Sequence, residues 1–163
     1  MNTEQHKILN DFIGTMDELK VLLGVLPEKG LDWAEREGEW SIRQVIHHLA
    51  DDGNVFTHAI ERVLVSPGSK VRFDGYPGND VWIEQLGYDQ QAVDPSLDLM
   101  QAQHTFLSEL LRRFPDRWQN KAFYYDELEK KAAEQSVAEI IIMLTEHMQE
   151  HIAMIKNIRQ KHR

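Results

Sequence analysis

The chain has 163 residues, a length that fits one domain with a core large enough to fold unaided, so residues 1–163 are expected to form a single domain. Its formal net charge is −9, which disfavours binding to nucleic acid or to anionic membranes. There is no cysteine, and this excludes disulfides, thiolate metal ligands and a cysteine nucleophile. The sequence shows neither a signal-peptide pattern nor an apolar window long enough to span a bilayer, and we expect a cytoplasmic protein.

The first predicted element is an amphipathic helix from about Thr3 to Leu26. Asn2 or Thr3 can cap its start, and Pro27 with Gly30 ends it. Apolar residues recur along it at helical spacing: Ile8, Phe12, Met16, Leu19, Leu22 and Leu23.

The second predicted helix has a clear start signal. Ser41 is a favourable N-cap, and Gln44 three residues later completes a capping box. Trp40 precedes the cap and pairs with Val45 as a hydrophobic staple, so Trp40 is expected to pack over the helix start. The apolar pattern continues until the helix is expected to end before Pro67.

Residues 66–94 differ from the helices around them, because glycine, proline and aromatic residues alternate there. A connection this long in a compact domain is usually functional or carries small elements of its own. We expect a crossover with one short helix near Asp80 to Leu86 that covers part of a site. Tyr76 and Trp82 are candidates for lining a pocket beneath it.

Two more helices follow the crossover. Asp94 and Pro95 predict a cap and a first-turn proline for a helix that runs to about Phe114. Its expected inward residues are Leu99, Phe106, Leu110 and Leu111. The charged stretch 126–134 is expected to be a solvated helical turn. The last helix begins at Ser136, where Glu139 completes another capping box.

Taken together, four amphipathic helices with a long connection between the second and the third predict an all-α fold. Its expected architecture is a four-helix bundle with a crossover.

Histidines mark the inner faces of the second and the last predicted helix. His147 and His151 are four residues apart, so they lie one above the other on one helix face. On the second helix, His48 falls on the apolar stripe and His47 on a more polar side. We therefore predict a metal site formed by His48, His147 and His151. Three protein ligands leave one position open for water or substrate, which is typical of catalytic zinc sites.

Carboxylates next to these histidines can anchor their second ring nitrogens. Asp51 or Asp52 is expected to orient His48, and Glu146 and Glu150 flank the other pair. The sequence leaves open which of these carboxylates turns inward. In the alternative interpretation, the histidines are core residues bonded to backbone carbonyls.

The remaining histidines are not expected to bind the metal. His104 is predicted at the edge of the bundle, with a place in a pocket as the alternative. His58 lies nearly a right angle away from His48 in helical phase. His6 and His162 lie near the termini and are expected to be exposed.

The stretch 39–51, with the sequence EWSIRQVIHHLAD, resembles the second-helix motif of the DinB/YfiT-like superfamily, which is grouped as metal-dependent hydrolases. The resemblance continues through Tyr76 and Trp82 and ends on His147 and His151. It implies an antiparallel four-helix bundle, often dimeric. It also implies that His48, with the last-helix pair, binds a divalent metal ion, usually zinc or nickel.

The resemblance further implies two kinds of chemistry at the open metal position. Water can be activated for hydrolysis, or a low-molecular-weight thiol such as bacillithiol, mycothiol or glutathione can be transferred to an electrophile. We accordingly expect a small-molecule substrate and a homodimer, with Asp51 or Asp52 beside the metal and no nucleic-acid or membrane partner. The alternative is a non-catalytic, stress-related bundle that acts as a binding or scaffold protein and binds metal only incidentally.

Overall fold

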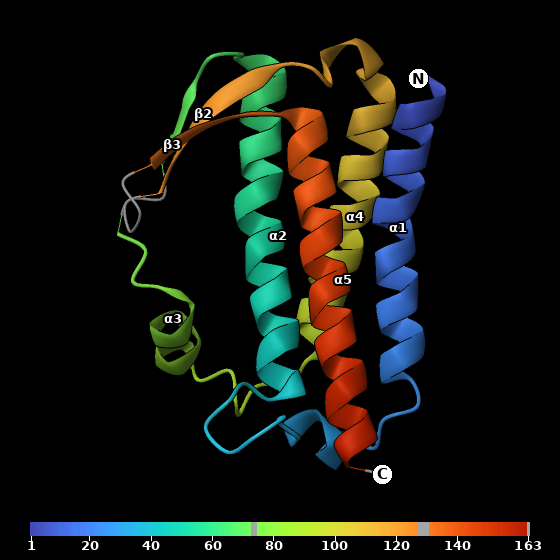
Figure 1. Cartoon of the computed structure of the whole chain (residues 1–163), viewed down its shortest axis with the longest axis vertical. Coiled ribbons are helices and arrows are strands. Elements are labelled where there is room, and N and C mark those ends of the chain that lie inside the picture. Colours follow the sequence, from blue (N-terminus) through green and yellow to red (C-terminus); the bar gives the residue numbers. More distant parts are fainter. Residues whose placement is uncertain (73–74, 127–130, 163) are drawn as a thin grey trace.

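Four long helices make up the body of the protein in a computed structural model (Figure 1). The structure describes residues 1–72, 75–126 and 131–162. The helices are α1 (Thr3–Leu23), α2 (Ile42–Val65), α4 (Asp94–Arg113) and α5 (Val137–Lys161). This arrangement confirms the predicted helix bundle. No helix in the described part of the chain is long and apolar enough to cross a membrane.

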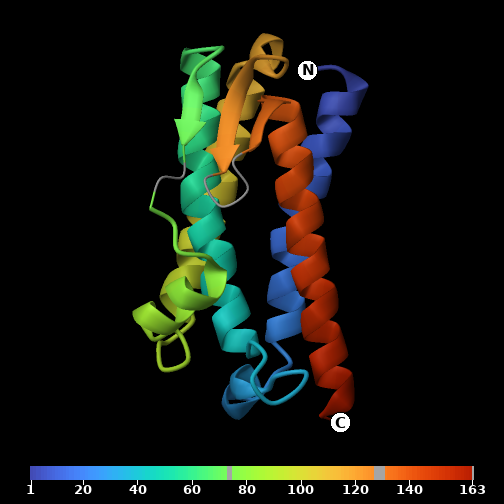
Figure 2. The ribbon, with the colours of Figure 1, turned by 60° about the vertical axis from the view of Figure 1, so that its left-hand side comes forward.

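The directions of the four helices follow from the crossover. α1 and α5 run one way along the bundle, and α2 and α4 run the other way (Figures 1 and 2). The connection between α2 and α4 returns the chain to the end where α2 began, so these two neighbours are parallel. α2 and α5, which carry the candidate metal ligands, are antiparallel.

The predicted start signals operate at three of the four helices. Asn2 caps α1. Ser41 caps α2 in a reciprocal capping box with Gln44, and Ser136 caps α5 in the same way. At α4 the prediction was wrong by one residue: Val93 is the N-cap and provides no side-chain hydrogen bond, while Asp94 is the first helical residue.

The crossover carries the short helix that the sequence predicted, α3 (Asn79–Leu86), which stands beside α2 and outside the bundle (Figure 1). Hydrogen bonds from aromatic side chains in α3 and directly after it attach this part of the crossover to α2. The Trp82 Nε1–H and the Tyr88 hydroxyl both donate to Asp51 Oδ2, over 2.9 and 2.6 Å. The Trp40 indole donates to Asp80 Oδ1 at 2.9 Å.

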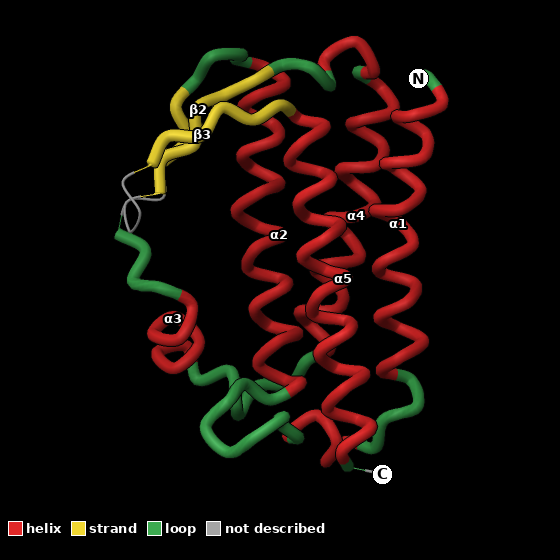
Figure 3. The backbone as a smooth tube through the Cα atoms, in the orientation of Figure 1, coloured by secondary structure: helices red, strands yellow, loops and turns green. Residues whose placement is uncertain are grey.

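A small sheet at one end of the bundle was not predicted (Figure 3). β2 (Lys121–Asp126) pairs antiparallel with β3 (Lys131–Ser136), and β1 (Lys70–Arg72) pairs parallel with β2. The prediction of a helical turn over 126–134 is therefore wrong for Asp126 and for residues 131–134, which lie in strands. Residues 127–130 lie outside the described residues. In β2, Ala122 and Tyr124 are buried whereas Lys121 and Phe123 are exposed, which is the period of two of a strand rather than that of a helix.

The buried face of α4 is also shifted from the predicted one. Leu99 and Phe106 were expected inward, but they are 38% and 46% exposed. Leu111 is buried as predicted. The inner face also carries Met100, Gln103, Leu107 and Ser108. Two polar residues thus point into the bundle from α4.

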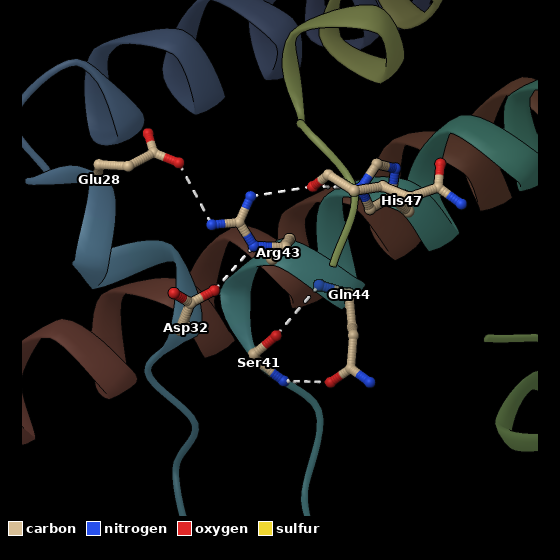
Figure 4. Close-up of polar contacts among 7 residues, drawn as sticks. Glu28, Asp32, Ser41, Arg43, Gln44 and His47 are labelled. Carbon is tan, nitrogen blue, oxygen red and sulfur yellow. Dashed lines mark hydrogen bonds and ion pairs between the residues drawn. The ribbon is translucent and has the colours of Figure 1, made fainter. Parts of the chain in front are cut away.

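Arg43 and His47, near the start of α2, contact the segment before α2 and the start of α4. The Arg43 guanidinium donates to Asp32 at 2.7 Å and lies 3.3 Å from Glu28, both in the 3-10 helix Glu28–Asp32 (Figure 4). His47 Nδ1 lies 2.7 Å from Ser96 Oγ at the start of α4. His47 is therefore a buried structural residue, which leaves the neighbouring His48 for the inner face.

Candidate metal site

Three histidine side chains from two helices meet inside the bundle. The potential ligand atoms of His48, His147 and His151 all lie within 4.8 Å of one another. His147 Nε2 is 3.4 Å from His48 Nε2 and 2.9 Å from His151 Nε2. Two nitrogens bound to one tetrahedral zinc ion at about 2.0–2.1 Å would be about 3.3 Å apart. The observed separations therefore suit a single shared ion.

The local structure explains why these three side chains converge. One helical turn separates His147 from His151, so both rings leave α5 on the same face. His48 leaves the inner face of α2, which is antiparallel to α5. His48 and His151 are only 4% and 8% exposed, whereas the side chain of His147 is 28% exposed. The open side of the site therefore lies next to His147.

The protonation of the three rings favours cation binding. Burial, together with the neighbouring imidazoles, lowers the pKa of His48 to about 3 and that of His151 to about 4. Burial also lowers the pKa of His147. All three rings are neutral at pH 7, and neutral imidazole is the form that binds a metal ion.

Asp52 supplies a carboxylate beside the histidines. Its Oδ2 lies 3.2 Å from His147 Nδ1 and 3.6 Å from His48 Nε2. The first contact places a carboxylate on the outer nitrogen of a candidate ligand, an arrangement that fixes the tautomer and the ring orientation of metal-binding histidines. Burial, and then the charge of Asp51, raise the pKa of Asp52 to about 7. A divalent cation nearby would favour its ionised form.

The other carboxylates predicted near the site do not join it. Asp51 accepts hydrogen bonds from Trp82 and Tyr88, so it holds the crossover and does not orient His48. Asp52 contacts the outer nitrogen of His147 rather than that of His48. Glu146 and Glu150 are exposed on the outer face of α5.

Aromatic side chains cover part of the three-histidine cluster. Trp40 meets the His48 ring edge-on at 5.0 Å and lies parallel to the His151 ring at 6.5 Å. Tyr76 and Trp82 are the predicted pocket residues of the crossover. Their ring centroids are 5.7 Å apart, and the two residues are 36% and 38% exposed. Burial, and then the charges of Asp52 and Asp51, raise the pKa of Tyr76.

His104 was predicted at the edge of the bundle, with a place in a pocket as the alternative, and the structure confirms the alternative. It is largely inside the bundle, with its ring stacked on Phe12 at 4.2 Å and its Nδ1 2.9 Å from the carbonyl oxygen of Met100. It lines a cavity together with Asp52 and His147. His104 turns inward because the buried face of α4 is shifted from the predicted one. The sequence analysis assigned that face wrongly and therefore placed His104 at the edge.

The other predictions for histidines fit the structure. His58 and His6 are exposed. His162 is exposed as well, although its ring stacks on Trp33 at 4.8 Å. None of the three lies at the three-histidine cluster.

The comparisons with known proteins agree on one family. The model of the DinB superfamily matches residues 12–155. The Bacillus subtilis protein named "Putative metal-dependent hydrolase YfiT" is 27% identical over 147 residues, which cover 88% of this chain and 78% of that protein. "Putative metal-dependent hydrolase OB0782" from Oceanobacillus iheyensis is 26% identical over 155 residues, which cover 93% of this chain and 86% of that protein.

A solved structure has the same fold. It is described as "YfiT from Bacillus subtilis is a probable metal-dependent hydrolase with an unusual four-helix bundle topology". It superposes with a TM-score of 0.83, covering 99% of this chain and 89% of that chain at 23% identity. The family match extends over most of the sequence, and the chain belongs to the DinB superfamily.

Proposed function

We propose that this protein is a metal-dependent hydrolase in which His48, His147 and His151 bind one divalent cation, zinc or nickel. The observation that carries the proposal is the convergence of three neutral imidazoles within 4.8 Å, with one ring anchored by Asp52. The names of the two relatives support the same class of reaction.

A divalent ion held by three histidines would lower the pKa of a bound water towards about 7 and polarise a substrate carbonyl or phosphoryl group. The residues of the chain prepare the site for this role. Asp52 Oδ2 lies 3.2 Å from His147 Nδ1, and a carboxylate there favours the tautomer with the proton on Nδ1, which leaves the Nε2 lone pair directed at the cluster. Trp40 shields His48 and His151, so the approach to the cluster is from the side of His147.

The crossover aromatics favour substrates that carry an apolar or aromatic group. Tyr76 and Trp82 present rings to solvent on the acidic side of the site, so an apolar or aromatic substrate group fits better there than an anionic one. A thiolate is also a good ligand for zinc or nickel. Thiol transfer to an electrophile is therefore tested beside hydrolysis.

The first experiment measures metal content. Metal-free protein titrated with zinc and with nickel should bind one ion per chain, and His147→Ala and His151→Ala should each abolish binding. His58→Ala removes an exposed histidine from α2 and should bind metal normally. Full metal content in both site variants would contradict the proposed metal site.

The second experiment measures turnover. Metal-loaded protein is screened against esters, amides and phosphoesters, and against thiols mixed with electrophiles, with His151→Ala as the blank. Hydrolysis above the blank supports the proposal, whereas turnover of thiol mixtures alone would reassign the protein as a transferase. A loaded protein that turns over neither class would favour the non-catalytic binding or scaffold role.

A further inference from the structure

A cavity on the inner side of the three-histidine cluster has polar walls, and the proposed chemistry uses only two of its polar residues, Asp52 and His147. Its polar lining comes from α2, α4 and α5: Asp52, Thr57, Gln103, His104 and His147. The rest of the lining is mainly apolar. Its volume of about 30 Å³ is enough for one or two water molecules.

Three buried polar atoms in this lining have no hydrogen-bond partner among the described residues. They are Thr57 Oγ1, Gln103 Oε1 and His104 Nε2. His104 Nδ1 lies 2.9 Å from the Met100 carbonyl oxygen, which can only accept, so Nδ1 carries the proton and Nε2 is an acceptor in the neutral ring. Gln103 Nε2 donates to Asn54 Oδ1 at 2.8 Å, and this leaves Oε1 as the unused acceptor.

These atoms define the kind of ligand that fits. Two of them are acceptors, and the Asp52 carboxylate on the same wall is a third. A ligand of this size must therefore donate hydrogens, and water does so while it accepts a hydrogen bond from the Thr57 hydroxyl. Buried waters typically make about three such hydrogen bonds to groups that the fold leaves unpaired.

A glycine makes room for this arrangement. A Cβ added to Gly53 would lie 2.1 Å from Gln103 Oε1 and 2.8 Å from its Cδ. Any larger residue at position 53 would thus displace the Gln103 amide from the cavity wall.

His104 also lines a second hollow, between α1 and α4 on the surface of the bundle. Its other residues include Asp17, Gln101, Thr105 and Ser108. The ring of His104, held by Phe12 on one face, therefore separates the inner cavity from an outer cleft. Charged or titratable groups line these two spaces from all four helices: Asp17, Asp52, Glu109, Arg112 and His147.

We propose that the inner cavity binds ordered water and that His104 passes protons between this water and the outer cleft. An excess proton on the cavity water passes to Nε2, which leaves neutral water and an imidazolium. When the ring turns towards the cleft and gives the same proton to water there, it returns to its starting tautomer. The use of this route in catalysis rests on the proposed function, whereas the hydration and the proton exchange do not.

The first test uses the metal-free protein. A high-resolution crystal structure should show water within hydrogen-bonding distance of His104 Nε2, and ¹⁵N spectra should show the proton on Nδ1. Thr57→Val removes a cavity hydroxyl and should reduce the water occupancy. Ser108→Ala removes a buried hydroxyl that also has no partner among the described residues but lines only the cleft, so it should leave the cavity water in place.

The second test measures proton passage. His104→Phe keeps an aromatic ring on Phe12 but has no acceptor. The exchange of the buried Thr57 hydroxyl proton with solvent, followed by NMR in metal-free protein, should slow by roughly 100-fold, the lower end of what a positioned acid–base group contributes. A cavity without water, a proton on Nε2, or unchanged exchange in His104→Phe would overturn the inference. If His104→Phe fails to fold, the Thr57→Val result and the wild-type tautomer still decide the hydration, and His104→Gln, which also lacks an imidazole, replaces it in the exchange measurement.

The metal-loaded protein separates this inference from the proposed function. If turnover is absent but cavity water and exchange behave as stated, the proposed hydrolase fails and the proton route stands. If turnover is present but is unchanged in His104→Phe and is not stimulated there by added imidazole buffer, the route has no part in catalysis.

Discussion

Replacing Gly53 with alanine tests whether the Gln103 amide occupies the wall of the inner cavity. Gly53 lies within α2, and a helix-interior glycine is about 0.5–1 kcal/mol less favourable than alanine. Helix propensity alone therefore predicts that Gly53→Ala stabilises the protein. The position of Gln103 predicts the opposite sign.

The magnitude follows from what the new methyl group would displace. It would lie 2.1 Å from Gln103 Oε1 and 3.2 Å from its Nε2, so the amide has to move as a whole. Gln103 is only 8% exposed, and its bond to Asn54 would be lost. Asn54 is exposed and can bond water instead, so the lost hydrogen bond leaves only the buried Gln103 amide without a partner. That costs about 1–3 kcal/mol, and the strain of moving a packed side chain adds about 1 kcal/mol. After the gain in helix propensity, Gly53→Ala should be destabilised by about 1–3 kcal/mol.

Gly14→Ala is the matched control. Gly14 is an exposed glycine within α1, and an added Cβ would meet nothing within 4 Å. Its variant should be more stable than the wild type by about 0.5–1 kcal/mol. Urea unfolding of the metal-free proteins measures both changes. Equal stabilisation by the two substitutions would refute the reasoning. The double variant Gly53→Ala/Gln103→Ala should be more stable than the sum of the single changes, because the second change removes the clash.

Three further predictions concern the metal site and the crossover. Asp52→Asn should weaken metal binding by about 10–100-fold, because the carboxylate beside the outer nitrogen of His147 is lost. Competition with a chelating dye measures the affinity, and an unchanged value would show that Asp52 does not support His147. Metal-free protein should lose stability as the pH falls from 7 to 4, because the lowered pKa values of His48 and His151 mean that the unfolded chain binds more protons there. The raised pKa of Asp52 acts in the opposite direction over this range, so Asp52→Asn should steepen the loss in urea titrations, and a shallower loss would be inconsistent with its burial. Asp51→Ala removes the acceptor of the Trp82 indole and should speed amide hydrogen exchange across α3 while α5 stays protected; equal protection of α3 would show that other contacts hold it.

The helices could be predicted because their signals are local. The capping boxes at Ser41 and Ser136 specify where α2 and α5 begin, and the spacing of His147 and His151 specifies that both face one way. The choice of His48 over His47 also follows from phase along one helix. In the structure, His47 Nδ1 lies 2.7 Å from Ser96 Oγ, as expected for a residue outside the cluster.

The features that were missed depend on contacts between distant parts of the chain. β2 pairs with the nearby β3 and with β1, which lies about fifty residues earlier. The charged, weakly alternating sequence of 121–136 indicates neither partner clearly. The apolar residues of α4 surround most of its circumference, so the pattern alone did not reveal which side faces α2. That choice decides whether His104 lies at the edge of the bundle or beside the three-histidine cluster.

Asp51 and Asp52 show why the acidic pair next to His48 was ambiguous in the sequence. Adjacent helical residues point about 100° apart, so only one of them can face the histidines. The crossover settles which, because Trp82 and Tyr88 bind Asp51 and leave Asp52 for His147. The two roles are also coupled by charge, since Asp51 helps to raise the pKa of Asp52. The position of the crossover therefore bears on the charge beside the candidate metal site, as well as on access to it.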